Sequence, residues 1–332
     1  MQYSGNEWKG SLRDRLNRQI MTLEELYKKG TDQLSEAGIE YPSVDAFYLL
    51  EYAARLNRTT YLMYKEQTVS TQNIDQYMEL IRQRMTHIPY QYITGRADFA
   101  GLTFEVDPRV LIPRLDTEVL FEQALRCLGE NAYVLDLCTG SGAIGIALKR
   151  YRPDVHMVLS DISEDALALA RINIEHNHLE VAKKTNSAAD PSHLEYGYDL
   201  NFGIRVVQSD LFDGLSVQES TEGKAVAGQF DVLVCNPPYV AERDYDDLMP
   251  EVKEHEPKLA LTAGEDGLEF YRRIAREAGT FLKDNGVMLL EIGCDQKEAV
   301  SALLRAQGYR DIRVVKDMAG LDRVIICRRS EK

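Results

Sequence analysis

Residues 132–148 read AYVLDLCTGSGAIGIAL. An apolar run typical of a buried strand is followed by glycines in the pattern G-x-G-x-x-G and then by a helical pattern. In this context Gly140 makes the tight turn, Gly142 lets the backbone approach a ligand, and Gly145 lets the helix pack closely on the strand. The stretch therefore predicts a strand–turn–helix unit of a doubly wound α/β sheet that binds a nucleotide-like cofactor at its turn.

A second apolar run, at residues 158–161, ends in Asp161. This residue follows the glycine turn by roughly 20 residues, the interval at which an acidic side chain holds ribose hydroxyls. Enzymes that bind nicotinamide cofactors and enzymes that bind S-adenosylmethionine both use this arrangement. The turn and Asp161 therefore leave both cofactor classes open.

Residues 230–239 read FDVLVCNPPY, a third apolar run that ends in a rigid tetrapeptide. Pro237 and Pro238 have fixed φ angles and no N–H, and a residue before a proline is held extended. The side-chain oxygen of Asn236 and the carbonyl of Pro237 are therefore available to accept hydrogen bonds from a planar NH2 group, with the Tyr239 ring beside them. Together with the glycine turn, this segment favours an adenosyl cofactor that delivers a methyl group.

With these motifs the chain resembles the HemK/PrmC family, S-adenosylmethionine-dependent methyltransferases that modify the glutamine of peptide chain release factors. Besides the glycine turn and 236–239, the resemblance covers residues 89–95, 99, 111–118, 256–257, 260–261 and 291–293. It implies a class I methyltransferase-like, Rossmann-type sheet with a C-terminal antiparallel strand. It also implies S-adenosylmethionine as the cofactor and, as the partner and acceptor, the Gly-Gly-Gln loop of class I release factors.

The resemblance also implies roles for individual residues. The cofactor-binding residues that it implies are Phe99, Cys138, Thr139, Gly140, Ser141, Gly142, Asp161, Asp210, Leu211 and Asn236. The substrate-binding residues are Asn236, Pro237, Pro238 and Tyr239, of which Asn236, Pro237 and Tyr239 form the catalytic set; no metal is expected. Two residues depart from the family pattern: Cys138 stands where glycine is common, and Leu211 stands where an aromatic residue often stacks on adenine.

The expected chemistry follows from the acceptor nitrogen. An amide nitrogen is a poor nucleophile, but it needs no prior deprotonation when the leaving group is a sulfonium. Acceptors at Asn236 and Pro237 would hold the NH2 group in line and favour the partial positive charge that grows on it. The Tyr239 ring would attract the positive charge of the sulfonium. Glu291, which ends an apolar strand, is assigned no catalytic role.

Composition excludes several other classes. The net charge of −14 argues against a broad phosphate-binding surface, so no stable nucleic-acid binding is expected. No apolar run approaches the roughly 20 residues of a membrane span, and the polar first residues lack a signal-peptide core. The five scattered cysteines indicate reduced thiols, so we expect a cytoplasmic protein. We also expect a monomer.

With 332 residues the chain has room for about two domains. We expect a helical, substrate-recognition domain at 1–95, a hairpin linker at 96–118 and the methyltransferase domain at 119–332. Predicted strands lie at 134–137, 155–160, 204–208, 231–235, 286–292, 312–316 and 323–328, and predicted helices at 143–150, 164–177, 268–278 and 296–307. Two polar stretches, 183–202 and 216–229, are predicted to be surface insertions.

Four alternatives stay open. A glutamine methyltransferase of a ribosomal protein would share every motif. A nucleic-acid amino-methyltransferase would use the same Asn-Pro-Pro-Tyr segment on a flipped base, although the acidic charge disfavours it. A nicotinamide oxidoreductase or a non-catalytic binding module would leave residues 236–239 without a purpose.

Overall fold

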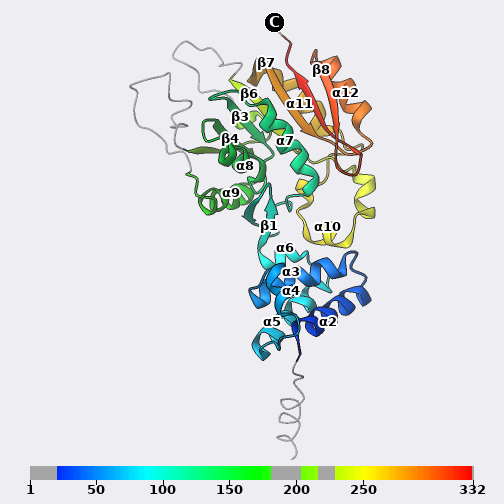
Figure 1. Cartoon of the computed structure of the whole chain (residues 1–332). Helices are drawn as coiled ribbons and strands as arrows, with labels where there is room; N and C mark the ends of the chain where they lie inside the picture. The colour runs from blue at the N-terminus through cyan, green and yellow to red at the C-terminus, as the bar shows by residue number, and fades with distance from the viewer. Residues whose placement is uncertain (1–20, 181–202, 216–228, 331–332) are drawn as a thin grey trace, which may run out of the picture. The chain divides into compact units, whose positions relative to one another are not determined.

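The computed structural model describes residues 21–180, 203–215 and 229–330. The chain divides into two compact units, Met1–Thr94 and Gly95–Lys332. Figure 1 shows helices throughout the first unit and a central sheet with helices in the second. The expected α/β class with an N-terminal helical region is confirmed.

The first unit is a small helical bundle. Its helices are α2 (Leu23–Glu36), α3 (Pro42–Ala54), α4 (Arg58–Tyr64), α5 (Thr71–Arg84) and α6 (Tyr90–Thr94). Helix α2 begins with a capping box, in which the Thr22 hydroxyl accepts from the Glu25 N–H at 3.2 Å and the Glu25 carboxylate accepts from the Thr22 N–H at 2.9 Å. The bundle core contains three aromatic rings in edge-to-face contact, from Tyr27, Phe47 and Tyr61.

The second unit is built on a seven-stranded sheet with the order β5-β4-β3-β6-β7-β9-β8. Its strands are β3 (Tyr133–Leu137), β4 (His156–Asp161), β5 (Ile204–Gln208), β6 (Phe230–Cys235), β7 (Leu282–Glu291), β8 (Arg310–Lys316) and β9 (Asp322–Arg328). Strands β3 to β7 are parallel, and β9 runs antiparallel to both β7 and β8. The predicted doubly wound sheet and its C-terminal antiparallel strand are therefore confirmed.

Helices cover both faces of this sheet, which is why its strands are apolar on both sides. Val134 joins the core cluster that contains residues of α7 (Glu118–Cys127), α8 (Ala143–Tyr151) and α9 (Glu164–His176). Its neighbour Leu135 joins the cluster that contains residues of α11 (Glu269–Phe281) and α12 (Lys297–Ala306) on the other face. The alternation of strand side chains thus divides the core into two layers.

The predicted hairpin is present and packs into the second unit. Strands β1 (Arg96–Phe99) and β2 (Leu102–Glu105) are antiparallel and joined by Ala100 and Gly101, with φ of +49° and +73°. Phe99 and Phe104 are buried in the same core cluster as α7 and α8. Helix α7 itself, and the short helix α10 (Pro250–His255), were not predicted.

The first predicted insertion, 183–202, lies outside the described residues, and so do residues 216–228 of the second, which was predicted at 216–229. Gln229, the last residue of the second stretch, is described, and there the prediction of a surface loop is wrong. Its side chain is buried, and its N–H donates to the Phe281 carbonyl at 2.8 Å, which starts the pairing that continues into β6.

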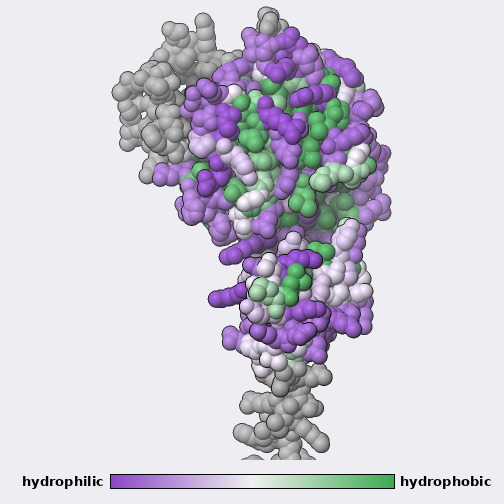
Figure 2. Space-filling view, in the orientation of Figure 1, coloured by the Kyte–Doolittle hydropathy of each residue, from purple (hydrophilic) through white to green (hydrophobic). Residues whose placement is uncertain are grey.

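Within the described ranges, no helix combines the length and the apolar character that a membrane crossing requires. Figure 2 shows that hydrophilic residues predominate on the visible face and that hydrophobic residues appear between them in patches.

Candidate active site

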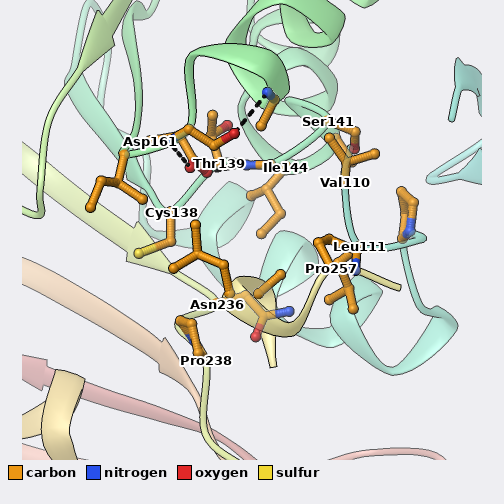
Figure 3. Close-up of a pocket in the computed structure, with 18 of the residues that line it drawn as sticks. Val110, Leu111, Cys138, Thr139, Ser141, Ile144, Asp161, Asn236, Pro238 and Pro257 are labelled. Carbon is orange, nitrogen blue, oxygen red and sulfur yellow. Dashed lines mark hydrogen bonds between the residues drawn. The ribbon is translucent and has the colours of Figure 1, made fainter. Parts of the chain in front are cut away.

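A cavity of about 320 Å³ opens at the carboxyl ends of β3, β4, β5 and β6. This is the sheet edge where α/β proteins bind ligands, and the chain order reverses there between β3 and β6. The predicted residues that line it are Phe99, Cys138, Thr139, Gly140, Ser141, Asp161, Asp210, Leu211, Asn236 and Pro238. In Figure 3 the cavity walls carry Asp161 and Cys138 on the left and Leu111 and Pro257 on the right, with Asn236 and Pro238 below. Its volume falls in the range of small-molecule pockets.

The glycine turn has the backbone that its sequence predicts. Gly140 and Gly142 have φ of +56° and +85°, the left-handed region that glycine adopts without strain. Cys138 shares that conformation, with φ of +57°, which explains why glycine suits this position and shows that cysteine occupies it under some strain.

Asp136 of strand β3 stabilises the glycine turn through hydrogen bonds. Its Oδ2 accepts from the Thr139 hydroxyl at 2.6 Å and from the Gly145 N–H at 2.9 Å. The side chain is fully buried, and burial raises its pKa to about 7. Asp136 therefore holds the turn against helix α8 without lining the cavity itself.

Asp161 ends β4 and faces the turn. One carboxylate oxygen accepts from the Gly140 N–H at 2.8 Å, and the other accepts from the Ser163 N–H at 3.0 Å. Burial raises its pKa. Because a carboxylate offers about four acceptor positions, Asp161 retains capacity to accept from a further donor, such as a ribose hydroxyl.

The wall after β5 is fixed by polar contacts but is largely apolar where it faces the cavity. The Asp210 carboxylate pairs with the Arg273 guanidinium at 2.9 Å. Leu211 is 3 % exposed and has a φ of +49°, and the adjacent wall includes Ile162 and Phe270. Leu211 itself is aliphatic at the position where the family often has an aromatic residue, and Phe270 contributes an aromatic ring to the same wall. Ile162, Phe270 and Arg273 were not predicted, although Ile162 directly follows Asp161.

Asn236 lies on the cavity wall at the end of β6, with Pro238 close by. Its Nδ2 donates to the Thr117 hydroxyl at 3.4 Å, and Thr117 lines the same cavity. The Asn236 side-chain oxygen is thereby left to face another donor.

Three predicted site residues, Gly142, Pro237 and Tyr239, are not among the described residues that line the cavity. Gly142 caps helix α8, and a Cβ added there would lie 2.6 Å from Ile146. Tyr239 packs against the second core layer, and burial raises its pKa to about 12. The predicted contact of Tyr239 with a sulfonium, and the acceptor role of Pro237, stay predictions.

Two of the motif segments meet beside the cavity, although 142 residues separate them. The buried Glu256 carboxylate accepts from the Ile112 N–H at 3.2 Å and pairs with the Arg114 guanidinium. This pair fixes residues 112–114, which carry Pro113 and Arg114 to the cavity wall.

Asn173, which sequence reasoning missed, joins the hairpin to the glycine turn. Its Nδ2 donates to the carbonyls of Glu105 and Ser141, and its Oδ1 accepts from the Glu105 N–H at 2.7 Å. Asn173 of helix α9 thereby fixes the hairpin and the glycine turn relative to each other.

The arrangement provides acceptors for hydroxyl and amide hydrogens and an apolar wall for a flat ring. Among the described residues, no group of three or more His, Cys, Asp or Glu side chains is placed to hold a metal ion. The hydrogen-bond acceptors and the apolar wall together are suited to holding organic molecules.

Comparison with known proteins identifies the relatives of this chain. Residues 25–95 match the PrmC N-terminal domain, and residues 109–200 match the methyltransferase small domain. A release factor glutamine methyltransferase of Clostridium acetobutylicum is 35 % identical over 93 % of this chain and 99 % of its own length. The protein of the same name from Streptococcus pneumoniae is 36 % identical over 92 % of this chain and 98 % of its own. With such identity over nearly the full length of this chain and of each relative, the chain belongs to the family of release factor glutamine methyltransferases.

Proposed function

We propose that this chain transfers a methyl group from S-adenosylmethionine to the side-chain nitrogen of the glutamine in the Gly-Gly-Gln motif of class I release factors. One observation carries the proposal. Asn236, whose side-chain oxygen can accept from a planar amide, lines the same cavity as Gly140 and Asp161, which suit an adenosyl group.

The residues present fit this cofactor. Asp161 would hold the ribose hydroxyls, the turn at Cys138–Gly142 would hold the methionine portion, and Asp210 and Leu211 would flank the adenine. When bound, S-adenosylmethionine supplies a methyl group on a positively charged sulfur. The side chains of Ile162, Leu211 and Phe270 would give the adenine ring apolar contact.

The acceptor amide needs orientation more than activation. Because Asn236 Nδ2 is hydrogen-bonded to Thr117, the Asn236 Oδ1 would accept one hydrogen of the substrate amide. The Pro237 carbonyl would accept the other. Both acceptors would stabilise the positive charge that develops on nitrogen. Tyr239 would supply its aromatic face to the sulfonium.

Residues 1–95 would recognise the release factor, and residues 96–118 would connect that unit to the methyltransferase domain at 119–332. The enzyme would act as a monomer in the cytoplasm, where release factors meet the ribosome.

The test is methylation of a purified class I release factor with S-adenosylmethionine that carries a deuterated methyl group. Mass spectrometry of the peptides should locate one labelled methyl on the glutamine of Gly-Gly-Gln. A Gln→Ala release factor should remain unlabelled. Label on a ribosomal protein or on an oligonucleotide, with none on release factors, would contradict the proposed acceptor.

A further inference from the structure

The side-chain amide of Asn236 can face the cavity in two ways, with its oxygen or with its NH2 group. Only the oxygen can accept a hydrogen bond from the amide of the substrate glutamine. The group that binds one end of the Asn236 amide determines which end faces the substrate. In this structure that group is the Thr117 hydroxyl, 3.4 Å from Nδ2.

Thr117 is 4 % exposed, so water does not compete freely for its hydroxyl. A hydroxyl has one hydrogen to donate and two lone pairs with which to accept. If that hydrogen is donated elsewhere, the hydroxyl can only accept from Asn236, and the amide is fixed with Nδ2 toward Thr117.

Glu291 is the group that can take this hydrogen. It ends β7, is 2 % exposed and lies within hydrogen-bonding reach of the Thr117 hydroxyl. Its backbone is held in place by the Tyr271 hydroxyl, which donates to the Glu291 carbonyl at 2.7 Å. Within the described part of the chain its Oε2 has no hydrogen-bond partner, which is costly for a buried carboxylate. Retention of such a group beside the cavity indicates a role there.

We propose that Thr117 and Glu291 are positioning residues, in which ionised Glu291 accepts the Thr117 hydrogen and Thr117 accepts from Asn236, so that the Asn236 oxygen faces the substrate amide. This inference rests on the proposed function. It assigns roles to two residues that do not touch the reacting atoms.

The charges around Glu291 make this arrangement sensitive to pH. Arg323 of β9, Arg114 and Asp116 face its carboxylate, and the Tyr239 and Tyr271 hydroxyls lie near it. The Arg323 guanidinium is shared with two aspartates, at 3.1 Å from Asp317 and 3.5 Å from Asp116, so its charge does not fully compensate Glu291.

Burial raises the pKa of Glu291 from 4.5 to about 7. Above that pH the carboxylate is ionised and accepts the Thr117 hydrogen. As the pH falls through about 7, protonated Glu291 becomes a donor, Thr117 can donate to the Asn236 oxygen, and the amide can turn its NH2 group toward the substrate. Turnover should therefore decline on the acid side.

The first test compares Thr117→Val, which removes the hydroxyl at nearly constant shape, with Thr117→Ser, which keeps it. Loss of one orienting hydrogen bond should lower kcat about tenfold in Thr117→Val, with a much smaller change in KM for the release factor. Thr117→Ser should restore most of the lost kcat. Thr280→Val, on the exposed face of α11, is the matched control. Thermal unfolding and calorimetric titration with S-adenosylmethionine establish that each variant is folded and binds the cofactor.

The second test measures kcat from pH 5.5 to 8.5 for wild type and Glu291→Gln. The glutamine stays neutral at every pH and does not titrate, so the decline of kcat below pH 7 should flatten. Glu298→Gln, exposed on α12, should keep the wild-type profile.

The outcomes separate this inference from the proposed function. If wild type does not methylate the Gly-Gly-Gln glutamine, the proposed function fails before any variant is compared. If wild type is active but Thr117→Val keeps its kcat, or Glu291→Gln keeps the acid decline, the positioning roles are wrong. If Glu291→Gln is inactive at every pH while Thr117→Val is normal, Glu291 acts directly on the substrate, and the inference is also overturned.

Discussion

The N–H of Gly145 donates a 2.9 Å hydrogen bond to the carboxylate of Asp136, across the contact between helix α8 and strand β3. The same oxygen accepts from the Thr139 hydroxyl, so one buried side chain connects the strand, the turn and the helix. This contact requires the helix to approach the strand closely, and glycine at position 145 permits that approach. The G-x-G-x-x-G pattern is thus a packing requirement as well as a ligand-binding one.

Gly145→Ala should destabilise the protein. A Cβ at this position would lie 2.2 Å from the Leu159 side chain and 2.9 Å from the Asp136 carboxylate, so the helix would have to shift. Overpacking of this kind costs about 1–3 kcal/mol, measurable as a lower midpoint in urea denaturation followed by circular dichroism. Gly129→Ala, where a Cβ meets nothing within 4 Å, is the control. Equal stability of the two variants would show that α8 can move away from β3 freely.

Asp136→Asn should change how stability depends on pH. The folded protein holds the Asp136 proton up to a pKa of about 7, whereas the unfolded chain releases it near 3.8. The folded state therefore binds more protons between these values, and the free energy of unfolding falls as the pH rises from about 4 to 7. Asparagine does not titrate, so the fall should be smaller in the variant. Glu291 has the same sign and leaves a residual slope.

Urea denaturation at several pH values between 4 and 7.5 measures that slope. Asp295→Asn, at an exposed position, should leave it unchanged. An Asp136→Asn protein whose slope matches wild type would mean that Asp136 is already ionised in the folded state.

The inner strands of the sheet could be predicted from sequence because they are buried on both faces and read as continuous apolar runs. Strand β6 was expected at 231–235 and lies at Phe230–Cys235. Helix α7 was missed although Leu120, Phe121 and Ala124 have helical spacing, because it begins inside the polar motif at 111–118. Helix α10 is short and has no buried residue, so it has no apolar pattern to find.

The cavity residues were predictable where a motif follows a strand directly, as at Asp161 and Asn236. The contacts that fix those residues were not, because their partners are distant in sequence. Asn173 binds Glu105 across 68 residues, and Asn236 binds Thr117 across 119. Such pairs form only when the fold brings them together, and a single sequence carries no signal for them.

Asp161→Ala should weaken S-adenosylmethionine binding. A hydrogen bond to a charged group contributes roughly 1.5–3 kcal/mol, so loss of the ribose contacts should reduce the affinity about tenfold to a thousandfold. The variant also removes the acceptors of the Gly140 and Ser163 N–H groups, so some loss of stability is expected with it. Calorimetric titration at a temperature where the variant is folded measures the affinity. An unchanged affinity in the folded variant would remove Asp161 from the cofactor site.

Asn236→Ala should separate cofactor binding from methyl transfer. Because Asn236 is expected to contact chiefly the acceptor amide, affinity for S-adenosylmethionine should largely survive. Turnover on a class I release factor should fall by about 10² to 10³, the usual effect of losing one preorganised hydrogen-bonding partner at a reacting centre. Single-turnover methylation followed by mass spectrometry measures the chemical step.

The Asn236→Asp variant sharpens this test. Aspartate keeps an acceptor for the substrate amide, but it loses the Nδ2 hydrogen that now binds Thr117 at 3.4 Å. It also adds a negative charge on the Thr117 side, where the buried Glu291 carboxylate already lies. Turnover should therefore be impaired in Asn236→Asp as well, although an acceptor oxygen is present. Full activity in Asn236→Asp would show that any acceptor suffices at this position and that the orientation of the asparagine amide plays no part in methyl transfer.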